Sequence, residues 1–281
     1  MLNIEHFEQI SLDGTWRFQL LHKPTEKLGK RWASIPVPGL WTMQEPSDVF
    51  FDKPIYTNVQ MPFSEQPPFV PEENPTGVYE RDFDLPKSWS GKRIVLQLGG
   101  YESVALIYIN SVEIGLTKDS RLAAEFDITQ FVNSGNNVIR IDVTKWSDAT
   151  FIEDQDQWWH GGITRSVKVY ATNKVFIEKF AATAGLEKDL TTGTLNVRAK
   201  ISSIDNESTD GYSLHLSIRE ITKQKSAVLS QTLKTFVAPI WTETPEEVAI
   251  AARDFFPCQV LEWKSSKICT DRGLNHGATS R

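Results

Sequence analysis

The sequence is poor in several features that mark particular classes of protein. It contains two Cys, three Met and no run of about 18 apolar residues, so it predicts neither a disulfide framework nor a membrane span. Cys258 and Cys269 belong to no CxxC or Cys/His pattern, which argues against a zinc site and favours two free thiols. The net charge is −6, so we expect no nucleic-acid partner. Residues Met1–Gln9 lack the apolar segment of a secretory signal, so we expect a cytoplasmic protein.

Aromatic residues, by contrast, are plentiful. The chain holds 9 Trp, 15 Phe and 6 Tyr. Flat rings stack on the C–H faces of sugars, and the same rings also fill the cores of β-sandwiches. From the count alone, core filling is the favoured interpretation and carbohydrate binding is the alternative.

Short strand patterns separated by turns predict an all-β protein. Arg93–Leu98, Val104–Ile109 and Ile163–Tyr170 are examples, and no segment sustains a helical period. We therefore predict a jelly-roll β-sandwich over residues 1–172. Residues 35–75 hold nine of the 14 Pro, so this region is predicted to form extended loops and sheet edges.

A second, smaller β-sandwich is predicted over residues 173–260. Trp becomes sparse there, and Leu195, Val197, Ala199 and Ile201 alternate with polar residues. About five strands are predicted, whereas an immunoglobulin-like sandwich has about seven, so this domain is expected to be incomplete. Residues 261–281 show no alternation and are predicted to be an irregular tail.

Asn74 is the first candidate functional residue. It opens the motif Asn74-Pro75-Thr76-Gly77 at the end of the Pro-rich region, where Pro and Gly favour a sharp bend. A side-chain amide donates and accepts hydrogen bonds at once, as sugar hydroxyls require. The alternative is an Asn that only closes its own turn, which is the more common role.

The densest cluster of polar residues is an acidic turn. Glu153, Asp154 and Asp156 repel one another unless cations or hydrogen-bond donors neutralise them, and carboxylate oxygens are ligands for Na⁺, Ca²⁺ or Mg²⁺. Trp158-Trp159 offer apolar faces nearby, and Gly161-Gly162 permit close backbone approach. A solvated acidic turn is the alternative. A glycosidase carboxylate pair is a weaker one, because these residues are too close in sequence to guarantee opposite sides of a bond.

These residues belong to a set of motifs that resembles glycoside hydrolase family 2 β-galactosidases. The motifs occur in the family's order between about Ile10 and Tyr170, and the resemblance continues weakly to about Ala251. They are Ser11–Phe18, Pro54–Val59, Pro67–Gly77, Asp119–Leu122 with Glu125–Asp127, and Trp146–Asp148 with Glu153–Asp156.

The resemblance implies a fold, an activity and two site residues. The first domain would be the family's galactose-binding-like jelly roll and the second its immunoglobulin-like domain. Asn74 matches the Asn that reaches into the galactose pocket. Asp156 matches the Asp that contacts galactose and a Na⁺ ion. Full-length members are homo-oligomers that use Na⁺ and Mg²⁺ to hydrolyse terminal β-D-galactose residues, as in lactose.

The sequence departs from the family in its length. The family's catalytic Glu pair and Mg²⁺ ligands lie in a following (β/α)₈ barrel of about 250 residues, for which this sequence leaves no room. We therefore predict an inactive β-galactosidase fragment with no catalytic residue of its own, part of a galactose pocket, and at most a partial Na⁺ site at Asp156. The alternatives are a non-catalytic carbohydrate-binding module and a subunit that complements a separate barrel-bearing chain. We interpret the tail as the product of a frameshift near residues 251–261.

Overall fold

The structure, a computed structural model, describes residues 8–44, 52–58, 60–154, 156–190, 193–204, 212–224, 227–239, 246–255 and 267–270. The chain divides into two compact units, and the boundary lies between Thr172 and Asn173. Strands dominate the described ranges, whose helices are short 3₁₀ turns, and none of these helices has the length or apolar character to cross a membrane. The predicted all-β class is confirmed.

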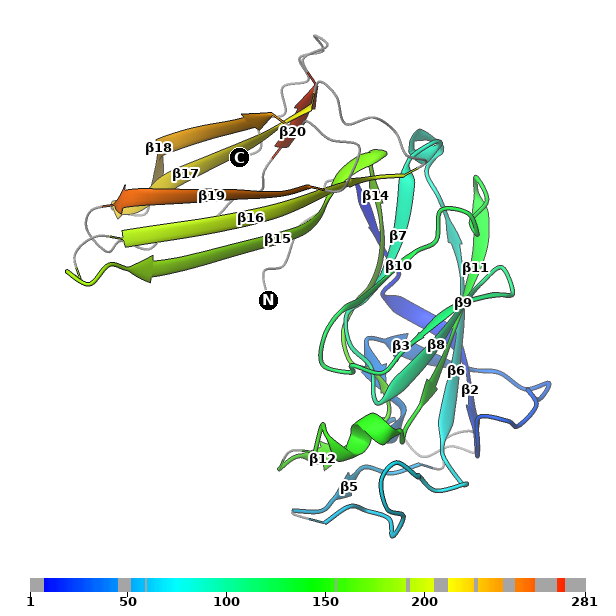
Figure 1. The fold of residues 1–281 in the computed structure, drawn as a ribbon. Coiled ribbons are helices and arrows are strands. Elements are labelled where there is room, and N and C mark those ends of the chain that lie inside the picture. The colour runs from blue at the N-terminus through cyan, green and yellow to red at the C-terminus, as the bar shows by residue number, and fades with distance from the viewer. Residues whose placement is uncertain are drawn as a thin grey trace. The chain divides into compact units, whose positions relative to one another are not determined.

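The first unit is built on two antiparallel sheets (Figure 1). The four-stranded sheet has the order β1 (Gln9–Ser11), β14 (Val167–Thr172), β7 (Arg93–Leu98) and β10 (Ala124–Asp127). The six-stranded sheet has the order β3 (Ala33–Val37), β2 (Gly14–Leu21), β6 (Thr76–Asp84), β11 (Asn136–Thr144), β8 (Val104–Ile109) and β9 (Val112–Thr117).

One hydrophobic core lies between these two sheets. Alternate residues of each strand point into it, such as Phe18 and Ile107 from the larger sheet and Leu96 and Val169 from the smaller one. Burial of side chains of this size stabilises the fold by about 1.5–3 kcal/mol each. Five Trp side chains are buried, which supports core filling for most of the Trp in this unit; they are Trp16, Trp41, Trp89, Trp146 and Trp159.

One strand prediction in this unit is wrong. Ile163–Tyr170 does not form one strand but two, β13 (Gly162–Ile163) and β14, with a turn between them. In that turn, the Gly99 nitrogen donates to the Ser166 carbonyl over 3.0 Å. A side chain at Gly99 would place its Cβ 2.9 Å from the same oxygen, so the two glycines at 99 and 100 admit the turn.

The Pro-rich region is largely extended, as predicted, and contributes only short elements. β3 forms an edge of the larger sheet, a position in which strands tolerate a proline such as Pro36. β4 (Gly39–Leu40) pairs with β13, and β5 (Ile55–Tyr56) pairs with β12 (Trp158–Trp159). These two small ladders join the Pro-rich region to the segment that follows the acidic turn.

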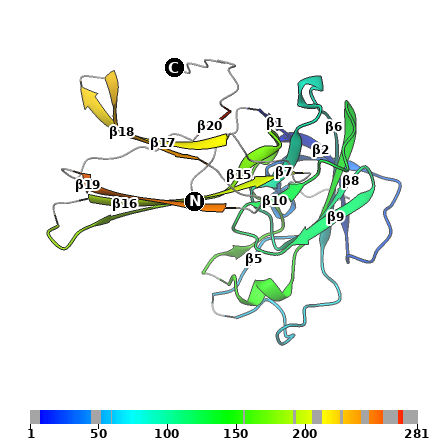
Figure 2. The ribbon, with the colours of Figure 1, turned by 45° about the horizontal axis from the view of Figure 1, so that its top comes forward.

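The second unit contains two three-stranded sheets (Figure 2). One has the order β15 (Val175–Leu186), β16 (Gly193–Ser203) and β19 (Glu246–Phe255), and the other β18 (Ala227–Pro239), β17 (Tyr212–Gln224) and β20 (Lys267–Thr270). Val197, Ala199 and Ile201 are buried, as their alternation predicted. Of the predicted tail, the structure describes only β20. Much of the proposed frameshift region, from residue 256 onward, lies outside the described residues.

Candidate functional site

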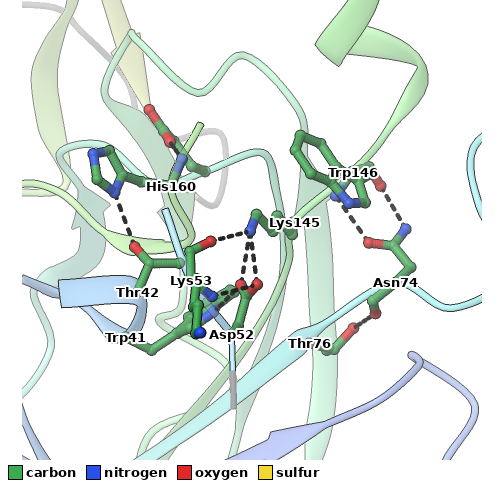
Figure 3. Close-up of polar contacts among 10 residues, drawn as sticks. Trp41, Thr42, Asp52, Lys53, Asn74, Thr76, Lys145, Trp146 and His160 are labelled. Carbon is green, nitrogen blue, oxygen red and sulfur yellow. Dashed lines mark hydrogen bonds and ion pairs between the residues drawn. The ribbon is translucent and has the colours of Figure 1, made fainter. Parts of the chain in front are cut away.

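Five segments meet at one end of the first unit, where hydrogen bonds and ring contacts link them. They are residues 39–44, 52–58, 74–76, 145–154 and 156–163. Asn74 and the candidate residues of the acidic turn lie on these segments. Figure 3 shows the polar contacts at the centre of this region.

A buried ion pair joins the Pro-rich segment to the end of β11. The Lys145 ammonium donates to the two carboxylate oxygens of Asp52 over 2.9 and 2.8 Å, and to the Lys53 carbonyl over 3.2 Å (Figure 3). The Trp41 indole nitrogen donates to the same carboxylate over 2.7 Å. The Lys145 ammonium also lies 5.1 Å from the centre of the Trp146 ring.

The environment of Lys145 explains why this pair is complete. Its side chain is only 1% exposed, and an unpaired charge in such a place would be very costly. Burial lowers the pKa of the Lys145 ammonium, while the neighbouring Asp52 carboxylate opposes that shift. Three donor groups compensate the carboxylate in turn: the Lys145 ammonium, the Trp41 indole and the Lys53 backbone nitrogen. The pair therefore anchors the segment 52–53 against the larger sheet.

Asn74 is buried and binds across the fold, not within its own turn. Its side-chain amide nitrogen donates to the backbone carbonyl of Trp146 over 2.8 Å, and its side-chain oxygen accepts from the backbone nitrogen of Trp146 over 2.9 Å. The Thr76 hydroxyl closes the local turn by donating to the Asn74 carbonyl over 3.1 Å. Asn74 therefore connects the segment just before β6 to the residues that follow β11 (Figure 3).

These bonds restrict what Asn74 can still bind. One N–H and one lone pair of its amide are not used by Trp146. The residue is only 4% exposed, so little of its surface is accessible to an approaching hydroxyl.

Trp146 continues the connection through a cluster of aromatic rings. Its ring contacts those of Phe63 and Trp159 in edge-to-face geometry, with centroids 5.3 and 5.6 Å apart. Phe63 also packs edge-on against Phe151, at the end of the 3₁₀ turn η3 (Asp148–Phe151). The Trp159 indole donates to the Thr57 hydroxyl over 2.9 Å, which connects the cluster to the Pro-rich segment.

Asp156 lies on the exposed side of the β5–β12 ladder. Its carboxylate accepts a hydrogen bond of 2.7 Å from the Tyr56 hydroxyl. Tyr56 and Trp158 face each other in the ladder, with ring centroids 5.5 Å apart, and are 48% and 54% exposed. An acceptor carboxylate thus stands beside two solvent-exposed rings.

Glu153 and Asp156 of the acidic turn do not converge on one point. Glu153 turns to Ser120, whose nitrogen and hydroxyl both donate to its carboxylate. Asp156 turns to Tyr56 instead. Donors on separate segments relieve the repulsion that the sequence predicts. In the ranges that the structure describes, no group of three or more His, Cys, Asp or Glu side chains is placed to hold a metal ion.

His160 is a hydrogen-bonded residue. Its Nδ1 lies 2.9 Å from the Thr42 hydroxyl, and its backbone nitrogen donates to Glu102 over 3.2 Å. Burial lowers the pKa of the His160 imidazole. Glu102 also pairs with Arg121, so Arg121 has its carboxylate partner outside its own turn.

The close backbone approach expected at Gly161-Gly162 is present. A Cβ at Gly161 would lie 2.1 Å from Cζ2 of Trp41, far inside van der Waals contact. Gly77 confines the same indole from another direction, since its Cβ would lie 2.8 Å from Cε3 of Trp41. Gly162 has a φ of 142°, a conformation that favours glycine.

The two predicted site residues are linked but do not touch through any described hydrogen bond. The connection runs from Asn74 to Trp146, from the Trp146 ring to Trp159, and along β12 to Trp158 beside Asp156. Sequence reasoning did not single out Lys145, Asp52 or Tyr56. A signal for Lys145 was present, because it continues the buried phase of β11 that includes Ile141 and Val143.

Comparison with known proteins assigns the first unit to a protein family. Residues 9–173 match the family described as "Glycosyl hydrolases family 2, sugar binding domain". The β-galactosidase of Psychromonas ingrahamii is 33% identical over 254 residues, which cover 87% of this chain and 24% of that protein. The β-galactosidase of Kluyveromyces lactis is 43% identical over 169 residues, covering 57% and 16%. The chain therefore spans about a quarter or less of the length of these relatives.

Solved structures agree on the fold. A calcium-binding mutant of Bacteroides uniformis β-glucuronidase 2 matches with a TM-score of 0.62 and 18% identity, covering 89% of this chain and 28% of that one. A family 2 glycosyl hydrolase from Bacteroides cellulosilyticus matches with a TM-score of 0.63 and 17% identity, covering 94% and 34%. At these identities the match speaks for the fold alone. The resemblance inferred from the sequence motifs is confirmed by the family and sequence matches.

Proposed function

Because the chain belongs to glycosyl hydrolase family 2 through its sugar-binding domain, we propose that it is the N-terminal sugar-binding region of a β-galactosidase and forms part of a galactose pocket. In this proposal the first domain is a jelly roll and the second is an immunoglobulin-like domain. The ligand is a terminal β-D-galactose residue, bound weakly by this region alone.

The observation that carries this proposal is the environment of Asp156. Its carboxylate stands beside the exposed rings of Tyr56 and Trp158, and a hydrogen bond of 2.7 Å orients it. A carboxylate accepts hydrogen bonds from sugar hydroxyls, and flat rings pack on sugar C–H faces. Asn74 supports the pocket chiefly by holding Trp146, with one donor and one acceptor left for a ligand.

Hydrolysis would need residues beyond this region. A retaining glycosidase uses an acid and a nucleophile whose carboxyl groups lie about 5–5.5 Å apart on either side of the bond. We place that pair in a catalytic barrel supplied by further sequence, in the same or a separate chain. Asp156 fits a Na⁺ ion as one oxygen ligand, and the other Na⁺ ligands and the Mg²⁺ site would also come from the barrel.

Two measurements on the 281-residue chain test this proposal. Titration with methyl β-D-galactoside, followed by NMR, should shift the signals of Asp156 and Trp158 at millimolar concentrations. Methyl α-D-mannoside, as the control, should shift them less. Absence of any shift with the galactoside would remove the support for a galactose pocket.

The second measurement is hydrolysis of a chromogenic β-galactoside. We expect no turnover by the chain alone, and turnover after addition of a barrel-bearing polypeptide of the family. Turnover by the chain alone would contradict the division of labour proposed here.

A carbohydrate-binding module without catalysis is the second candidate. It is favoured by the single continuous core of the first unit, which draws on both of its sheets and so supports independent folding. Sugar binding without any gain of hydrolysis on complementation would favour this candidate over the first.

A further inference from the structure

We propose that Tyr56 is a positioning residue: its hydroxyl holds the Asp156 carboxylate in the orientation that receives the sugar. The inference rests on the proposed function, because it concerns the same site. Tyr56 lies 100 positions before Asp156 in the sequence, and its hydroxyl donates to Oδ1 over 2.7 Å.

Asp156 has need of such a contact. Its side chain is exposed, it lies between η3 and β12, and its neighbour Trp158 belongs to a strand of only two residues. An exposed aspartate samples several side-chain rotamers unless a partner selects one. A hydrogen bond to an ionised acceptor is among the stronger kinds, so the Tyr56 hydroxyl is suited to that selection.

Contacts at several points hold the segment that carries Tyr56. Its backbone pairs with Trp158 in the β5–β12 ladder, and the two rings lie 5.5 Å apart. The Trp159 indole bonds to the next residue, Thr57, over 2.9 Å. At the start of this segment, the buried Lys145 ammonium donates hydrogen bonds to the Asp52 carboxylate and the Lys53 carbonyl.

These contacts connect the core to the exposed carboxylate. The buried ion pair holds the start of the segment 52–57, and the β5–β12 ladder holds its middle. The Tyr56 hydroxyl, fixed in this way, orients the Asp156 carboxylate. The hydrogen bond to Asp156 also raises the pKa of the Tyr56 phenol from its ordinary value of 10.0, so the phenol stays a donor at neutral and mildly alkaline pH.

The decisive variant is Tyr56→Phe in the full 281-residue chain, because it removes only the hydroxyl. Phe69→Leu is the control, since Phe69 is 71% exposed on the same Pro-rich region. We expect the Hα–Hβ three-bond couplings of Asp156, measured by NMR, to change from the distinct values of one rotamer toward the averaged values of several in Tyr56→Phe. The control should leave these couplings unchanged. Unchanged couplings in Tyr56→Phe overturn the inference, whatever the sugar does.

Sugar binding provides the second readout. Tyr56→Phe should weaken methyl β-D-galactoside binding about threefold to tenfold in a wild-type background. It should cause no further loss in an Asp156→Ala background, because the positioned carboxylate is then gone. The unfolding midpoint should stay the same, which separates this loss from a loss of folding.

The outcomes separate the two proposals. Equal affinity of Tyr56→Phe and wild type, or equal losses in both backgrounds, overturns the positioning role and leaves the galactose pocket in place. No binding by the wild type, together with rotamer-averaged Asp156 couplings in Tyr56→Phe, overturns the pocket and leaves the positioning contact in place.

Discussion

Replacing Gly161 by Ala should disrupt the packing that supports the candidate site. The new Cβ would lie 2.1, 2.5 and 2.6 Å from three atoms of the Trp41 indole, whereas carbon atoms in contact are normally about 3.5–4.0 Å apart. The indole must therefore move by about 1.5 Å or the backbone must yield. It cannot retreat freely, because Gly77 and Phe18 close the opposite side.

The cost follows from two contributions. Overpacking in a core costs about 1–3 kcal/mol. A moving indole also loses its 2.7 Å hydrogen bond to the Asp52 carboxylate, a bond to a charged group worth about 1.5–3 kcal/mol. We therefore expect Gly161→Ala to lower the free energy of unfolding by about 3–5 kcal/mol, a large part of a typical domain's stability.

Urea unfolding of the full chain, followed by Trp fluorescence, measures this effect. Seven of the 9 Trp precede residue 160, so the signal reports mainly on the first domain. Gly29→Ala is the matched control. Its Cβ would meet only Gln19 at 3.6 Å, an ordinary contact, so its effect should stay within about 0.5 kcal/mol.

A second variant tests the cause directly. Trp41→Phe removes part of the ring that Gly161→Ala strikes, so the double variant should lose less stability than the sum of the two single changes. Strict additivity, or a cost of Gly161→Ala below about 1 kcal/mol, would refute the steric argument.

Three further predictions concern charge and pH. Lys145→Met leaves the Asp52 carboxylate without its ammonium partner and should lower the free energy of unfolding, measured in urea, by about 3–5 kcal/mol. Adding Asp52→Asn should recover part of that stability, and a double variant with no recovery would contradict the buried ion pair. Burial raises the pKa of the Tyr101 phenol from 10.0 to about 12, so the folded state keeps this proton after the unfolded state has released it. Stability should thus fall as pH rises from about 10 to 12, less steeply in Tyr101→Phe; equal slopes in alkaline unfolding series would contradict this. Exchange of NaCl for KCl should leave the thermal midpoint of the 281-residue chain unchanged, because Asp156 is the one Na⁺ ligand we assign to it; a sodium-specific rise would reveal a fuller site.

Local pattern predicted much of the first domain. β7 and β8 begin and end where the sequence predicts them. In β8, alternate residues are buried, because one face points into the core and the side-chain period of a strand is two. β13 and β14 escaped that pattern because the turn between them depends on contacts with Gly99 and Gly100, about 65 positions earlier. β12 pairs through two residues only, too few for periodicity to indicate a strand.

The site was predictable in its residue types and less so in its contacts. The motifs point to Asn74 and Asp156, and the structure places them on connected segments. The sequence presents the acidic turn as one cluster, yet Glu153 and Asp156 turn to donors that lie 33 and 100 positions away. Nothing in the turn itself says which donors will stand opposite it.

The sequence by itself determined the all-β class, the change in composition after Thr172, where Trp becomes sparse, and the motifs that assign the first domain to its family. Those properties are local, since a strand's period or a motif's spacing is complete within a few residues. Only the tertiary structure decided that Lys145 would meet Asp52 and that Tyr56 would hold Asp156. These pairs are separated by 93 and 100 positions. They meet because sheet order and burial, not sequence distance, set which side chains lie opposite one another.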